Sequence, residues 1–104
     1  MKKVRITVLR RSVYPDLMEL YENPLENPCE MKLGQVFLSE DGKKPEEFCG
    51  EAWKCMASFV ETLAKGGGNF FDGWMKNEAS AMISCNDGFR PVSFLLEAIP
   101  EDSE

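Results

Sequence analysis

One long stretch of helical periodicity lies between two regions of strand-like alternation, and it limits the folds open to the chain. Apolar residues recur at intervals of three and four along this stretch: Phe48, Ala52, Met56, Phe59 and Leu63. Pro45 suits a first helical turn, Glu46 and Glu47 complement the positive end of a helix dipole, and Gly66–Gly68 can form a C-terminal cap. The sequence therefore predicts one main helix that begins near Pro45 and ends before Gly66.

Strand patterns lie on both sides of this helix. Residues 3–11 alternate between polar and apolar, and residues 34–39 are a short apolar run before the turn signal Asp41-Gly42. Residues 79–85 and 91–99 are rich in strand-forming residues and are separated by Asn86-Asp87-Gly88, a strong turn signal. The sequence predicts four strands, the last two of which form an antiparallel hairpin.

These elements indicate an α+β fold in a single domain spanning residues 1–104, with residues 100–104 as a frayed tail. We expect about four mostly antiparallel strands, one long helix packed on one face and a C-terminal β-hairpin. A short helix over residues 15–21 is also predicted, whereas residues 69–77 fit either a loop or a short helix. Six apolar residues are candidates for the contact between helix and sheet: Val4, Ile6, Ala81, Ile83, Phe94 and Leu96.

The charge of the chain argues against a nucleic-acid partner. Five basic and no acidic residues lie in the first eleven positions, so the remaining residues carry a net charge of −11 against −6 for the whole chain. An acidic body repels phosphate backbones. The basic segment is expected to be a solvated strand or an edge strand. Because it alternates and lacks a continuous apolar core, we also expect no signal peptide, no membrane partner and a cytoplasmic location.

Cysteine is the unusual reactive residue type, because the chain has four cysteines and no histidine. The absence of histidine excludes Ser-His-Asp and Cys-His mechanisms within the chain. In the cytosol the thiols stay reduced, and thiolates can bind zinc or an iron–sulfur cluster. Cys29, Cys49 and Cys85 are the candidate metal ligands. Cys55 follows Cys49 by six residues, about 120° around a helix, and is not expected to face the same ion.

Three further residues are candidates for ligand binding. Trp53 can wall a pocket, although a tryptophan on an apolar helix face also fits the core. Asp87 can hold the hairpin turn through its own backbone, and Arg90 can remain on the surface or pair with a negative charge. Cys49, near the start of the helix, is also a candidate reactive thiol. A thiol redox enzyme is less favoured because the sequence has no CxxC pair.

Two functions from different classes fit these residues, and whether the protein is an enzyme stays open. The first is a small cytosolic binding protein with a cysteine-lined site for a metal or a small anionic ligand. The alternative is a non-catalytic structural or self-association module, in which the cysteines pack in the core and sheet edges or residues 70–74 form a homo-oligomer contact.

Several short motifs along the chain also form a combined pattern: KVRITV, Asn-Pro-Cys ending at Cys29, GQVF, PEEFC followed by Ala52-Trp53, GGGNFFDGWM and SCNDGFRPVSF. This pattern resembles a family of short, uncharacterised prokaryotic conserved hypothetical proteins, and it spans nearly the whole chain. The resemblance implies that the following residues occupy family-motif positions: Cys29, Cys49, Trp53, Cys85, Asp87, Gly88, Arg90 and Pro91. Cys55 falls outside the pattern. The resemblance implies no activity, because the family has none to carry over.

Overall fold

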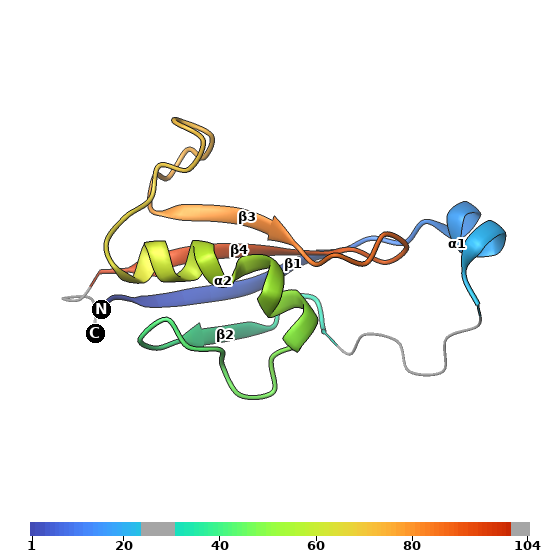
Figure 1. Ribbon diagram of the computed structural model, residues 1–104, viewed down its shortest axis with the longest axis horizontal. Coiled ribbons are helices and arrows are strands. Elements are labelled where there is room, and N and C mark those ends of the chain that lie inside the picture. The colour runs from blue at the N-terminus through green and yellow to red at the C-terminus, as the bar shows by residue number, and fades with distance from the viewer. Residues whose placement is uncertain (24–30, 101–104) are drawn as a thin grey trace.

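The computed structural model describes residues 1–23 and 31–100 as one α+β domain (Figure 1). Its elements follow the chain as β1 (Lys3–Arg11), α1 (Pro15–Tyr21), β2 (Val36–Ser39), α2 (Gly50–Ala64), β3 (Ser80–Ser84) and β4 (Val92–Ile99). The predicted tail falls largely on residues 101–104, which lie outside the described part of the chain.

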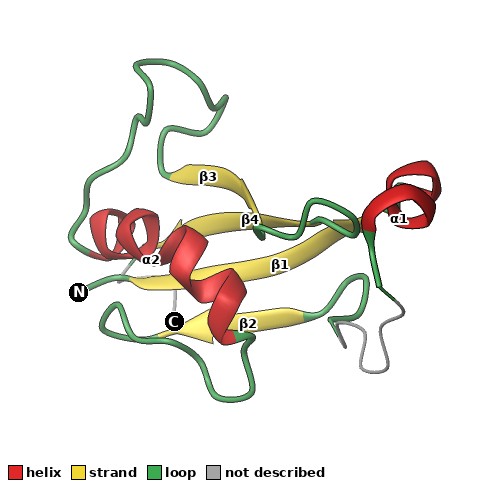
Figure 2. Cartoon of the chain, turned by 45° about the vertical axis from the view of Figure 1, so that its right-hand side comes forward, coloured by secondary structure: helices red, strands yellow, loops and turns green. Residues whose placement is uncertain are grey.

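The four strands form a single antiparallel sheet in the order β2-β1-β4-β3. In the central pair, Ile6 lies opposite Leu96 and Val8 opposite Phe94. The register shifts between Val8 and Arg10, where a β-bulge interrupts the pairing. Helix α2 crosses one face of the sheet, as Figure 2 shows, so the fold has two layers. The predicted fold class and the C-terminal hairpin are confirmed.

The hydrophobic core lies between α2 and the sheet. Met56, Val60 and Leu63 of α2 are fully buried against the inner side chains of β1 and β4. Among the six residues predicted for this contact, Ile83 is half-buried against the core and the other five are buried: Val4, Ile6, Ala81, Phe94 and Leu96. Alternation in the strands and the helical period therefore identified the two packed faces correctly.

The main helix begins later than the sequence indicated. Residues 45–48 form a turn, in which Phe48 N donates to Pro45 O at 3.3 Å, and Glu47 has φ of +63°. A residue at positive φ cannot belong to a right-handed helix, so α2 begins only at Gly50, with Cys49 as its N-cap. Glu51, instead of Glu46 or Glu47, is the acidic residue in the first turn.

The basic strand β1 is an interior strand, which corrects the prediction of an edge strand. It pairs with β2 on one side and with β4 on the other. Lys3 and Arg5 are tolerated there because they alternate onto the face away from α2, where Arg5 binds Glu97 at 3.1 Å. Arg11, past the bulge, lies instead opposite the buried Val92 on the other face. The alternative prediction, a strand solvated on one face, agrees with the exposed Arg5 side chain.

Residues 69–77 form turns and bends instead of a short helix. Asn69, Phe71 and Asp72 all have positive φ, which breaks any helical run. The loop is anchored at its base by Asn69 N, which donates to Glu78 O at 2.7 Å. Glycine is required beside this bond, because a β-carbon on Gly68 would collide with the same carbonyl oxygen.

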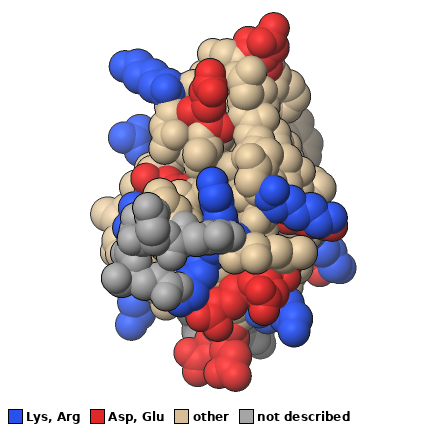
Figure 3. Space-filling model, turned by 90° about the vertical axis from the view of Figure 1, so that its left-hand side faces the viewer, with Lys and Arg blue, Asp and Glu red and all other residues tan. Residues whose placement is uncertain are grey.

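The surface at the N-terminal end of the molecule carries acidic and basic side chains interspersed, without a continuous basic area (Figure 3). Within residues 1–23 and 31–100, no helix is both long enough and apolar enough to cross a membrane.

Two leucines test the location of the core. Leu63→Ala, at a fully buried position, should lower the free energy of unfolding by about 2–5 kcal/mol because it removes packed methyl groups and leaves a cavity. Leu33→Ala, at a side chain that is 69% exposed, should change it by less than about 0.5 kcal/mol. Urea unfolding of both variants measures the difference, and equal losses would contradict this core.

Candidate functional site

A pocket of about 210 Å³ lies between the start of α2, the start of β4 and the loop that joins β3 to β4. Buried apolar side chains form much of its wall: Met31, Ala52, Val92 and Phe94. Two cysteines and four polar residues complete the lining: Cys49, Cys85, Glu51, Asn86, Asp87 and Arg90. The pocket therefore gathers four of the six predicted site residues from distant parts of the sequence, which are Cys49, Cys85, Asp87 and Arg90.

Both cysteines of the pocket are unpaired, half-buried thiols. The backbone of Cys49 caps α2, and its carbonyl oxygen accepts a hydrogen bond from Trp53 N at 3.0 Å, while its side chain makes no capping bond. Cys85 directly follows β3, and its Sγ accepts a hydrogen bond from Val92 N at 3.3 Å. The N–H of Val92 therefore points at one of the two sulfurs.

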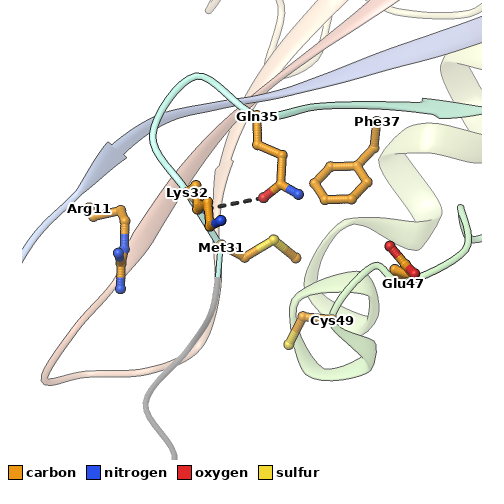
Figure 4. A pocket seen from close by; sticks show the side chains of 7 residues that line it. All are labelled: Arg11, Met31, Lys32, Gln35, Phe37, Glu47 and Cys49. Atoms are coloured by element: carbon orange, nitrogen blue, oxygen red, sulfur yellow. Dashed lines mark hydrogen bonds between the residues drawn. The ribbon is translucent and has the colours of Figure 1, made fainter.

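A third sulfur belongs to Met31, which is 6% exposed. Its loop is held by Lys32 N, which donates to Gln35 Oε1 at 3.1 Å. Figure 4 shows the Met31 side chain reaching towards Phe37 and the start of α2. Here a second and larger hollow, of about 1060 Å³, shares Met31 and Cys49 with the pocket. Met31 and Cys49 thus lie between two open spaces.

Asp87 shapes the loop at the pocket. Its Oδ1 accepts hydrogen bonds from Phe89 N at 2.8 Å and from Arg90 N at 3.1 Å, which fixes the turn after β3. Asp87 thus holds the hairpin turn through backbone hydrogen bonds, as the sequence predicted.

Arg90 is held by a long-range ion pair. Its Nη1 donates to Oε2 of Glu22 at 2.8 Å, and the two side chains are only 22% and 15% exposed. Glu22 is the C-cap residue of α1, so the pair joins α1 to the loop between β3 and β4. Because Glu22 already neutralises the guanidinium, Arg90 offers little attraction to an incoming anion.

Among the described candidates, Trp53 does not join this pocket, and Cys55, which was not expected at the site, does not join it either. Trp53 is half-buried and packs edge-on against Phe48, with ring centroids 6.2 Å apart, and it is not part of the lining. Cys55 also lies elsewhere, and its Sγ donates to Glu51 O at 3.5 Å. Cys29 falls outside the described residues. Across residues 1–23 and 31–100, no three His, Cys, Asp or Glu side chains lie close enough together to hold a metal.

Sequence reasoning missed two residues of this region, Met31 and Glu22. Nothing in the pattern singles out a lone methionine in a loop, apart from its position two residues after Cys29. The pairing of Glu22 with Arg90 joins residues 68 positions apart, and no local signal reports such a contact.

Comparisons of the chain with protein-family models, with curated proteins and with solved structures found no match. The resemblance to a family of short prokaryotic proteins stays a prediction.

The turn at the pocket can be tested at Asp87. Asp87→Ala removes the acceptor of two backbone N–H groups and should lower the free energy of unfolding by about 1–3 kcal/mol. Asp87→Asn keeps a side-chain oxygen and should lose less than about 1 kcal/mol. Chemical denaturation of both variants distinguishes them. An equal loss in the two would show that charge, instead of these bonds, stabilises the turn.

Proposed function

We propose that this protein is a small binding protein whose site is the pocket of Met31, Cys49 and Cys85, and that its ligand is a thiophilic metal ion such as zinc or copper(I). One observation carries the proposal. Three sulfur-bearing side chains from three separate segments line a single pocket of about 210 Å³. Thiolate and thioether sulfurs are the ligands that soft metal ions prefer.

The surroundings of the sulfurs favour a cation over the small anionic ligand that was the other possibility. Arg90 is neutralised by Glu22, while Glu51 and Asp87 add negative charge to the lining. The N–H of Val92 can remain bonded to Cys85 Sγ after that thiol loses its proton, and such a bond is stronger to a thiolate. Metal binding would release the thiol protons.

The donor set within the described residues is smaller than most structural metal sites require, since tetrahedral sites use four ligands. Cys29 is a candidate for a further ligand, because only one residue separates it from Met31 in the sequence. The predicted trio of Cys29, Cys49 and Cys85 thus enters the proposal, with Met31 added.

Metal content of the full chain tests this function. We expect protein purified without oxygen and loaded with zinc or copper(I) to keep about one ion per chain. Cys49→Ser and Cys85→Ser should each weaken retention by at least about tenfold, because a hydroxyl is a poor ligand for a soft ion. Elemental analysis after dialysis against a competing chelator measures the retained metal.

Cys55→Ser is the matched control, because it makes the same change at a thiol outside the pocket. It should retain metal like the unmodified chain. Failure of the unmodified chain to retain either ion, or an equal loss in all three variants, would contradict the proposal. Circular dichroism of each variant establishes that the fold persists.

The alternative function, a structural or self-association module, has an observation in its favour. Phe71 and Trp74 are exposed on the loop after α2 and contact each other edge-on, with ring centroids 5.2 Å apart. Exposed aromatic side chains are frequent anchors at protein interfaces. The loop follows the C-terminal end of α2, whereas the pocket lies at the N-terminal end, so the two features are separate.

We expect this loop by itself to be insufficient for a stable homo-oligomer. Stable interfaces bury roughly 800 Å² on each partner, which is more than two mutually packed rings can supply. Trp74→Ser should therefore leave the mass of the protein in solution unchanged, as measured by light scattering. A fall in mass for this variant would instead identify the loop as the interface.

A further inference from the structure

Helix α1 presents apolar side chains that no described part of the chain covers. It has no buried residue, and Leu20 and Tyr21 are 70% and 75% exposed. Val13 and Tyr14, immediately before the helix, are also exposed. Isolated helices shorter than about 12 residues are marginal in water. A seven-residue helix with this surface therefore needs an apolar partner.

The contacts that hold α1 in place are polar and lie to one side. Ser12 N donates to Pro91 O and Tyr14 N to Phe89 O, each at 2.9 Å, and Glu22 pairs with Arg90. These bonds fix α1 beyond the end of the sheet, at the right of Figure 1, in a molecule that measures 48 × 30 × 20 Å. Its position is set, but its apolar side chains are left unpacked.

The same chain has a second uncovered apolar surface, on the sheet face opposite α2. Four residues in register form a row across all four strands on this face: Val36, Thr7, Leu95 and Met82. Leu38 lies two positions along β2 from Val36, and these two side chains are 42% and 55% exposed. Within residues 1–23 and 31–100, no helix packs on this face (Figure 2). We call it the open face.

The charges of the two surfaces are complementary. Segment 15–21 carries Asp16 and Glu19 and no basic residue. On the open face Arg5 is already paired with Glu97, so the positive charge available to the helix comes from Arg10, which lies past the bulge opposite Ser93 and has no ion pair within the described residues. Because α1 lies beyond the end of the sheet in both ribbon views, it does not reach its own open face. The open face of a second copy can accept it.

We propose that this chain forms a twofold-symmetric dimer in which α1 of each copy packs on the open face of the other. Leu20 and Tyr21 contact the row formed by Val36, Leu95 and Met82, with Leu38 beside it. The exchange is reciprocal, so it closes as a dimer, the commonest symmetry of soluble oligomers. It covers both apolar surfaces and gives each sheet a helix on either face. This interface differs from the Phe71–Trp74 loop and does not depend on metal binding.

Sedimentation analysis of the full chain, from about 1 µM to about 1 mM, tests the proposal with two single variants. Leu20→Lys and Leu38→Glu each place a charge in the contact and should each weaken the dimer by about tenfold or more. Phe71→Lys, a matched change at an exposed apolar residue outside the contact, should have no effect. Each substituted side chain is exposed in the single chain, so the fold should persist by circular dichroism.

An equimolar mixture of Leu20→Lys and Leu38→Glu distinguishes this dimer from other symmetric arrangements. In the mixed dimer, one contact has unmodified surfaces on both sides, and the other brings a lysine to a glutamate. The mixture should therefore associate more tightly than either variant alone. A contact between two α1 helices would be weakened by Leu20→Lys alone, and a contact between two open faces by Leu38→Glu alone. An effect of only one of the two variants would overturn the proposal. A mixture that associates no more tightly than the single variants, or an unmodified chain that is monomeric, would overturn it too.

Discussion

The pairing of β1 with β4 is the interaction on which the other elements depend. It brings the two ends of the sequence together, and it places Val4, Ile6 and Val8 beside Leu96 and Phe94 on one continuous apolar face. Helix α2 has a buried stripe that packs on that face. Without this pairing, the sheet would separate into two two-stranded pairs, β1–β2 and β3–β4, and an isolated two-stranded pair is only marginally stable in water.

The same pair of strands also creates the site and the outlying helix. β1 and β4 continue past the β-bulge, so Val92, opposite Arg11, reaches the start of α2 and lines the pocket together with Phe94. Beyond β1, Ser12 and Tyr14 form backbone hydrogen bonds with the loop that joins β3 to β4, and α1 begins directly after these bonds. The pocket and α1 thus share the Glu22–Arg90 ion pair, which has its acid on one feature and its base on the other.

Periodicity predicted the fold because burial imposes it directly on the sequence. Three local patterns favour the same fold: the alternation of β1, the turn signal at Asn86-Asp87-Gly88 and the helical spacing of Met56 to Leu63. The start of α2 was misplaced because positive φ at Glu47 depends on the turn it belongs to, and glutamate carries no signal for it. Cys49, Cys85 and the Asp87 turn of the candidate pocket were singled out from the sequence. Tertiary packing brings Met31 to the pocket and Glu22 to Arg90, and such packing leaves no trace in local spacing.

The hydrogen bonds between Cys85 and Val92 make a sulfur atom part of the end of the β-hairpin. Cys85 N donates to Val92 O at 3.0 Å, and Val92 N donates back to the sulfur at 3.3 Å, in place of a carbonyl oxygen. The last hydrogen-bonded pair between the two arms of the hairpin therefore includes an acceptor whose chemical state can change, unlike a backbone carbonyl. Any change in the charge or oxidation level of this sulfur alters the strength of the hydrogen bond from Val92 N. The stability of the hairpin end therefore depends on the chemical state of the pocket.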